Sequence, residues 1–317
     1  MPLHDLAISV KGKWTRVPAL EVDGRHVVSK GGWIKTASVH DEFWLERGVD
    51  DPQPYVDALK GHAKELPADI FTFAQRLPDV TPRYAYAMAW DSVAAIRLDD
   101  TKAWWDGLPQ EGRKNVRRAA KRGVTASITP LDDDLVRGIV SINNEVPMRQ
   151  GKPFAHYGKT CEQVKQDYSS FEGRAEFVCA HAEGELIGFI QLVYMHGSAH
   201  ILEILNREAH YDKRPANLLI ERAVMRCAEK GMSHVIYGRY SYGNKGTQNP
   251  LTEFKRRNGF EEFRVPRYYV PITTAGRLFL ALKLHRGLLE ILPERVISPL
   301  LALRRLWYRS SAIRRPV

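Results

Sequence analysis

The chain has 317 residues, of which 44% are hydrophobic and 26% are charged, and its formal net charge is +10. This length suits two domains, and the ordinary hydrophobic share excludes a disordered or fibrous chain. No apolar run reaches the ~18 residues that a membrane-spanning helix needs, and the first residues lack the apolar segment of a secretory signal. Three widely spaced cysteines argue against a disulfide framework or a zinc site. We therefore expect a cytoplasmic protein.

The positive charge is concentrated at the end of the chain. Residues 274–317 contain nine Lys and Arg against two Glu, which gives +7 and leaves only +3 for all the other residues. A nearly neutral body does not indicate a nucleic-acid-binding protein, so we expect no DNA partner.

The first third of the chain predicts a small α/β segment. We expect strand, turn and irregular loop over 25–50, a helix over 51–64, a strand over 69–77, and one interrupted or two separate strands over 83–98. A single helix is then predicted over 101–124. It carries six Lys and Arg between Arg113 and Arg122 beside an apolar stripe of Val116, Ala119, Ala120 and Val124. We favour a solvated surface for these charges, and the alternative is that they steer an anionic donor.

The remainder of the chain alternates more clearly. We predict a strand over 124–130, helices over 131–146 and 159–171, and three strands over 175–182, 185–195 and 198–205 that are joined by tight turns. A helix over 216–230, a strand over 233–238, a helix over 249–260 and a closing strand over 261–273, interrupted by Pro266, follow. Residues 274–317 predict two basic amphipathic helices.

Two possible motifs do not hold. Residues 238–247 nearly spell a phosphate-binding loop, but Asn244 displaces the lysine and no helix follows at once. His196 and His200 are four residues apart across a hairpin turn, so they do not share a helical face. We predict no metal site.

Three stretches carry a resemblance to a known family. They are WWDGLPQEGRKNVRRAAKRGV (104–124), EGELIGFIQLVY (183–194) with ANLLIERAVMRCAEKGMSHVIYG (216–238), and LTEFKRRNGFEEFRVPRYYVPIT (251–273). Their order and spacing resemble the GNAT acyl-CoA N-acyltransferases, and within them the FemAB-like branch. The resemblance implies a mixed α/β GNAT fold with two tandem halves: a degenerate half over 1–110, the acyltransferase domain over 111–273, and a basic helical tail over 274–317.

The resemblance also implies an activity, the direct transfer of an acyl group from acyl-CoA, as co-substrate, to an amine. HYDKRPANLL (210–219) stands where GNAT enzymes have a glycine motif for the pyrophosphate of CoA, and it has no glycine. Aminoacyl-tRNA-dependent addition of an amino acid to a cell-envelope precursor is therefore an alternative. A non-catalytic protein at the membrane surface is another, because the tail could hold the chain at the inner face of the membrane.

Candidate site residues follow from the same resemblance and from the local pattern. Glu203 on a largely apolar strand is the candidate base, because burial makes a carboxylate more basic. Its alternatives are a structural ion pair with Lys or Arg, or a hydrated sheet end. Tyr240 and Tyr242 are candidates to protonate the leaving group, or they pack. Candidate donor-binding residues are Lys213, Arg214, Ala216 and Asn217, at a helix start that attracts anions, and Lys255, whose alternative is pairing with Glu253 or Glu262.

Overall fold

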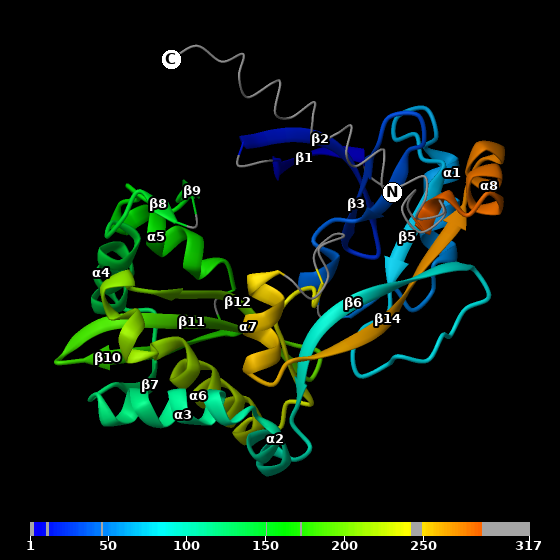
Figure 1. Cartoon of the computed structure of the whole chain (residues 1–317). Helices are drawn as coiled ribbons and strands as arrows, with labels where there is room; N and C mark the ends of the chain where they lie inside the picture. Colours follow the sequence, from blue (N-terminus) through cyan, green and yellow to red (C-terminus); the bar gives the residue numbers. More distant parts are fainter. Residues whose placement is uncertain are drawn as a thin grey trace, which may run out of the picture.

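The computed structural model describes residues 3–10, 13–45, 47–149, 151–171, 173–241 and 249–286, and these residues form one mixed sheet of twelve strands and a separate hairpin (Figure 1). In spatial order the strands are β1 (Leu3–Val10), β2 (Lys13–Val22), β3 (Arg25–Lys30), β4 (Thr36–Val39), β5 (Ile70–Ala74), β14 (Glu261–Pro271), β6 (Ala87–Arg97), β13 (His234–Ile236), β12 (Ser198–Asn206), β11 (Glu185–Met195), β10 (Ala175–Ala182) and β7 (Thr125–Thr129). The hairpin pairs β8 (Met148–Arg149) with β9 (Lys152–Pro153).

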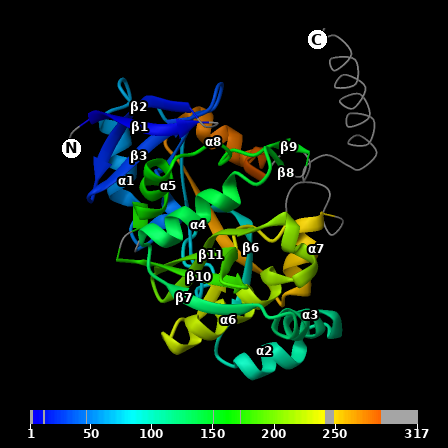
Figure 2. The same ribbon diagram turned by 90° about the vertical axis from the view of Figure 1, so that its left-hand side faces the viewer.

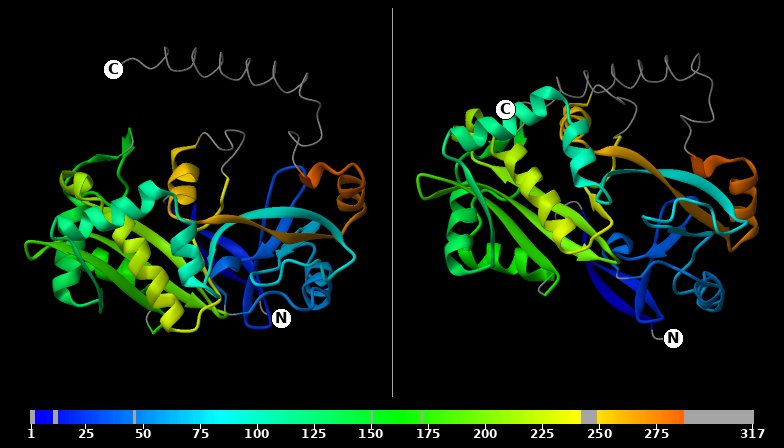
Figure 3. Two further views of the ribbon diagram at one scale, coloured as in Figure 1. Left: turned by 60° about the horizontal axis from the view of Figure 1, so that its bottom comes forward. Right: turned by 90° about the horizontal axis from the view of Figure 1, so that it is seen from below.

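Helices cover both faces of this sheet. They are α1 (Gln53–Gly61), α2 (Thr101–Gly107), α3 (Gln110–Lys121), α4 (Asp133–Asn143), α5 (Cys161–Tyr168), α6 (Pro215–Glu229), α7 (Pro250–Arg257) and α8 (Thr274–Ala281), with 3-10 turns η1 (Glu42–Trp44), η2 (Ser169–Phe171), η3 (Glu208–Lys213) and η5 (Leu284–Arg286). One core cluster joins α3 and α6 to one face of β10–β13, and a second joins α4 and α5 to the other face (Figures 1 and 3). A third core joins α1 to β2–β5 and β14. Figure 2 shows α1 in the same part of the molecule as β1, β2 and β3.

The first part of the chain, up to residue 110, and the second part, from residue 111, share strands of one sheet. β14 is the last strand in the sequence, yet it lies between β5 and β6 and pairs antiparallel with both. β6 in turn pairs with β13 of the second part. The sheet is therefore continuous between the two parts of the chain. The boundary of the two halves at residue 110 remains a prediction.

The structure corrects several sequence predictions. The helix expected over 101–124 is two helices, α2 and α3, because Gly107 and Pro109 stop one helix and start the next. β14 runs through Pro266, whose carbonyl still accepts a hydrogen bond from the Gln75 amide. β6 is one continuous strand, and Ala120 is exposed while Ala119 is buried. β1 and β2 were not predicted.

The predicted turns around β11 are confirmed. Glu183 and Gly184 have φ of 54° and 81°, and His196 and Gly197 have φ of 46° and 70°. Two consecutive residues with positive φ are the geometry of a two-residue hairpin whose twist matches the sheet, and glycine at the second position adopts it without strain. These turns set the register of β10, β11 and β12.

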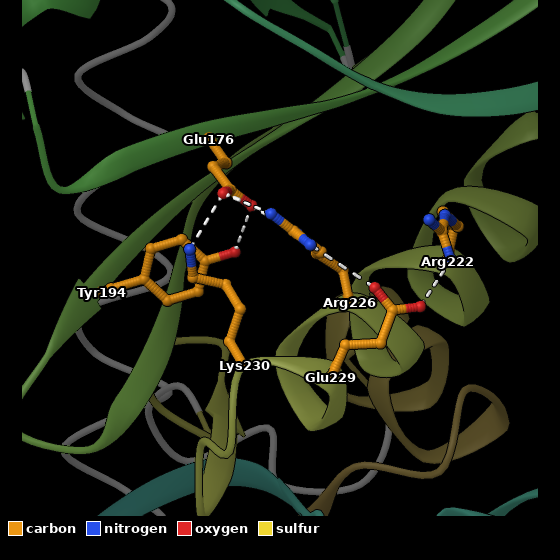
Figure 4. Close-up of polar contacts among 6 residues, drawn as sticks. All are labelled: Glu176, Tyr194, Arg222, Arg226, Glu229 and Lys230. Atoms are coloured by element: carbon orange, nitrogen blue, oxygen red, sulfur yellow. Dashed lines mark hydrogen bonds and ion pairs between the residues drawn. The ribbon is translucent and has the colours of Figure 1, made fainter.

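An ion cluster fastens α6 to β10 and β11 (Figure 4). The Glu176 carboxylate accepts hydrogen bonds from Arg226 through Nε and Nη2, both at 2.8 Å, from Lys230 at 3.0 Å and from the Tyr194 hydroxyl at 2.8 Å. Arg226 also contacts Glu229. These donors, with Arg226 contributing most, lower the pKa of Glu176 to about 2. The cluster therefore favours the charged carboxylate in the folded protein.

Replacing Glu176 with Gln is expected to lower the free energy of unfolding by about 2 kcal/mol at neutral pH. Because the pKa of Glu176 is lower in the folded than in the unfolded chain, its contribution is complete above the unfolded value, about 4.3, and is lost as the pH falls toward about 2. Urea unfolding at several pH values measures this. Glu229→Gln, on the exposed rim of the cluster, is the control, and an equal loss in both variants would contradict the prediction.

Candidate functional site

The parallel strands β12 and β13 diverge in the middle of the sheet. They pair at Ala199 with Val235 and at His200 with Ile236, after which β13 ends and β12 continues to Asn206. A bulge lies at the same place, because consecutive residues of β11 face Glu203 and Ile201 and leave Leu202 unmatched. A bulge bends its strand and interrupts pairing. Beyond Ile201, β12 thus has no paired strand on this side among the described residues.

The chain that leaves β13 follows β6 instead of β12. The Tyr237 amide donates to Ala94 O at 2.8 Å, and Gly238 O accepts from the Ala94 amide at 2.9 Å. Lys255 of α7 is fully buried and donates from Nζ to Tyr237 O at 2.7 Å and to Arg239 O at 2.6 Å. Burial lowers the pKa of Lys255 to about 8. The lysine therefore holds one wall of the opening in place.

The predicted alternative for Lys255, an ion pair with Glu253 or Glu262, is wrong. Glu253 pairs instead with Arg256 and Arg257, its own neighbours on α7, and Glu262 accepts a hydrogen bond from Ser92. Contact of Lys255 with a donor phosphate stays a prediction, and the described geometry gives this ammonium two backbone carbonyls as partners.

A cavity of about 440 Å³ lies at the divergence. Residues from η1, β5 and its following loop, β6, β12, β13 and β14 line it, so both parts of the chain contribute. The lining is mostly apolar and includes Trp44, Leu77, Val93, Met195, Ile201, Leu202, Ile236 and Val265. The charged and polar residues of the lining include Arg76, Asp91, His200 and Arg239. A cavity of this size and character suits a small organic group with a few oriented polar contacts.

Glu203 lies on the face of β12 that α5 covers. The buried Tyr168 hydroxyl donates a hydrogen bond to its Oε2, and His156 Nε2 lies 3.5 Å from its Oε1. Burial, then the charge of Glu203, raises the pKa of Tyr168 well above its ordinary value, so the phenol stays protonated and donates. Gln191 supports the group by donating to Tyr168 O at 3.3 Å. Glu203 thus has a tyrosine and a histidine as described partners, not the Lys or Arg of the structural alternative.

Aromatic side chains lie between Glu203 and the cavity. Glu203 does not line the cavity itself, but His200 does, and the Trp44 ring lies 5.8 Å from the His200 ring and 5.2 Å from the Phe171 ring. Phe171 ends η2, which follows Tyr168 directly. Burial, with a smaller effect of Arg76, lowers the pKa of His200 to about 4, so its imidazole is neutral at physiological pH. Sequence reasoning considered His200 as a metal ligand only and missed its place in the cavity.

The start of α6 offers basic side chains but no glycine. Arg214 has φ of 58° and is exposed, and its side chain has no ion pair within the described residues. Lys213 pairs with the exposed Glu183 at 3.3 Å, and Asn217 donates to Asn258 Oδ1 at 2.8 Å. Ala216, half-buried, completes the first turn. The helix has no side-chain N-cap, so its first amides are not capped by Arg214.

The basic helix α3 packs along α6 (Figure 3). Arg122 at its end binds Asp212, just before the start of α6, at 2.7 Å. Its side chains Lys114, Arg117 and Lys121 are exposed. Part of the predicted basic surface therefore stands beside the start of α6.

The remaining candidates are placed in part. Tyr240 packs, partly buried, against the core of the second part, while Tyr242 lies outside the described residues. In the tail, α8 packs on β14, and residues 287–317 lie outside the described range. Among the helices that the structure describes, none combines the length and apolarity needed to cross a bilayer.

Comparison with known proteins gives a domain match for the middle of the chain and a fold. Residues 110–256 match the family model "Acetyltransferase (GNAT) domain". L-PGS from Bacillus licheniformis is 14% identical, with a TM-score of 0.51 over 82% of this chain and 85% of that chain. The C-terminal domain of a putative lysylphosphatidylglycerol synthetase from Agrobacterium fabrum is 15% identical, with a TM-score of 0.51 over 83% and 86%. FemX is 10% identical, with a TM-score of 0.49 over 88% and 90%. No curated protein sequence matches significantly.

Proposed function

Because residues 110–256 match the model of an acetyltransferase (GNAT) domain, we propose that this chain transfers an acyl group from an activated donor to an amine. The observation that carries the proposal is the divergence of β12 and β13 beside an apolar cavity of about 440 Å³. Backbone groups freed there can bind a carbonyl, and the cavity can hold the acyl group or the arm that carries it.

The proposed reaction is direct attack by the amine. The amine nitrogen bonds to the donor carbonyl carbon, and Glu203, or a water that it holds, takes the amine proton. Amides of β12 beyond Ile201 stabilise the oxyanion. The bond to the leaving group then breaks, and the leaving group takes a proton, for which Tyr240 and Tyr242 remain candidates.

Two of the three cysteines, Cys179 and Cys227, are unsuited to form a covalent enzyme intermediate. Burial raises the pKa of Cys179 to about 11 and of Cys227 to about 12. A thiol attacks as the thiolate, and these two thiols stay protonated near neutral pH. Both are fully buried and lie in the cores on either side of the sheet, away from the cavity lining.

The donor is an acyl-CoA or an aminoacyl-tRNA, and one observation favours each. Arg214, which has no ion pair among the described residues, lies at a helix start without a side-chain cap and suits the pyrophosphate of CoA. The exposed basic residues of α3 beside that start suit a longer polyanion and favour the tRNA donor as a second candidate. Solved structures named for lysylphosphatidylglycerol synthesis share the fold, and this agrees with either donor.

Binding experiments separate the donors. Acetyl-CoA, longer acyl-CoAs and charged tRNA are tested one at a time. We expect the true donor to raise the melting temperature of the protein and to be detected bound to it by native mass spectrometry. If the donor is a tRNA, its affinity should fall steeply as the salt concentration rises. If the donor is a CoA thioester, its affinity should depend much less on salt. Absence of binding by every donor would contradict the proposed function.

Arg214→Gln is expected to weaken binding of the donor by about tenfold, because a charge-assisted hydrogen bond to phosphate is lost. The control is Arg137→Gln on α4, an exposed arginine that forms an ion pair with Asp134 of the same helix. Isothermal titration with the donor found above measures both variants. Equal affinity of Arg214→Gln and the unmodified protein would place the phosphates elsewhere.

A further inference from the structure

Three side chains from neighbouring strands meet at one end of the sheet. His4 lies on β1, Glu21 on β2 and His26 on β3, and one ligand atom from each lies within 4.8 Å of the others. Glu21 faces His26 in the register of β2 and β3, and His4 faces Ala19, two residues from Glu21 on the same side of the strand. The pairing of three strands therefore builds this cluster.

One atom of the cluster is unsatisfied. Nδ1 of His26 is screened from solvent and has no hydrogen-bond partner within the described residues. The rings of His4 and His26 lie edge to face, with centroids 4.7 Å apart. Buried polar atoms in proteins almost always have a partner, so an orphaned imidazole nitrogen beside a second imidazole and a carboxylate needs an explanation.

We propose that His4, Glu21 and His26 bind a divalent transition-metal ion of the Zn²⁺ type. Two imidazoles and one carboxylate are a set of ligands that zinc uses when its fourth position is open to water or to another ligand. Ligand atoms stand about 2.0–2.2 Å from zinc. Ligand atoms at that distance from one tetrahedral ion stand about 3.5 Å apart, and the three atoms here already lie within 4.8 Å of one another.

The ion would stabilise the edge of the sheet. β1 is the terminal strand and pairs with β2 alone. A metal bound by β1, β2 and β3 would join the edge strand to the third strand and stabilise the folded state by its binding free energy. In the order of the sheet, β4, β5, β14, β6 and β13 separate these strands from β12, so the site is distinct from the cavity.

The test uses the full chain without a histidine tag, freed of metal by a chelator and then titrated with Zn²⁺ by isothermal titration calorimetry. We expect one ion per chain and a higher melting temperature with Zn²⁺. His4→Gln and His26→Gln are each expected to weaken Zn²⁺ affinity by at least about 10- to 100-fold, since even supporting groups around a metal cost that much. The control His181→Gln, on β10 in the other part of the sheet, keeps the affinity of the unmodified protein.

Two results would overturn the proposal: no stoichiometric Zn²⁺ binding by the unmodified chain, or a Zn²⁺ affinity of His4→Gln and His26→Gln that equals the affinity of the unmodified chain. Circular dichroism without metal shows whether each variant folds. If His26→Gln does not fold, His4→Gln decides the question, because its strand β1 is at the edge of the sheet and pairs with β2 alone. Glu21→Gln, which removes the carboxylate charge and keeps its shape, is expected to weaken binding as well.

Discussion

Replacing Glu203 with Gln is expected to reduce turnover by about 10²- to 10⁴-fold, the usual contribution of a positioned general base. The glutamine has nearly the same shape and can still accept the hydrogen bond of Tyr168, but it cannot take a proton from the amine. Donor affinity should therefore stay within about twofold. Single-turnover kinetics, with the donor and an amine acceptor found by screening, measures the chemical step apart from binding.

The control for this variant is Glu185→Gln at the start of β11. Glu185 pairs with Arg207 at 2.9 Å and has a half-exposed side chain, so its loss removes a carboxylate from the same sheet without touching the cavity. Its turnover should equal that of the unmodified protein. If Glu203→Gln retains turnover within a few-fold, the base is another group, and the neutral His200 in the cavity is the next candidate.

Local pattern was enough to predict most of the second part of the chain. The turns at Glu183-Gly184 and His196-Gly197 require positive φ, and they separate alternating segments that can only pair as adjacent antiparallel strands. Glycines at the ends of helices mark α6 and α7 in the same way: Gly231 has φ of 69° and Gly259 has φ of 79°. Each of these turn and helix-end signals lies within a few residues of the turn or helix end that it determines.

Pairing between distant strands could not be predicted in this way. β14 has the composition of an ordinary closing strand, and nothing in its sequence indicates that it lies between β5 and β6. β1 and β2 were missed because their apolar residues are interspersed with polar and charged residues. The cluster of His4, Glu21 and His26 depends on that pairing, so the sequence predicted no metal site.

The candidate site shows the same division. The position of Glu203 on a largely apolar strand follows from alternation, but its partners Tyr168 and His156 come from α5 and the preceding loop and are set by packing. Lys255 was predicted to bind the donor or to pair with Glu253 or Glu262, whereas the structure buries it and directs its Nζ to two backbone carbonyls at the opening. Residues that support a site are thus harder to find from sequence than those that carry the chemistry.

Replacing Arg267 with Met is expected to lower the free energy of unfolding by about 3–5 kcal/mol, the cost of removing one member of a buried ion pair. Arg267 on β14 donates to Asp91 of β6 at 2.7 Å and to Glu42 of η1 at 3.0 Å, and its side chain is 13% exposed. Burial opposes its charge, but the two carboxylates outweigh burial and raise the pKa of Arg267. Methionine would leave both carboxylates without this partner, and guanidinium chloride unfolding measures the loss.

The matched control is Arg264→Met on the same strand, where the arginine is exposed and has no ion pair within the described residues. Its cost should not exceed about 0.5 kcal/mol. Adding Glu42→Gln and Asp91→Asn to Arg267→Met is expected to recover part of the loss, because the uncompensated charges disappear while Gln can still accept the Ala74 amide that binds Glu42 at 2.6 Å. Asp91 also lines the cavity and Glu42 begins the turn that supplies Trp44, so Arg267→Met should weaken donor binding as well as stability. Equal costs for Arg264→Met and Arg267→Met would mean that this ion cluster does not hold the two parts of the sheet together.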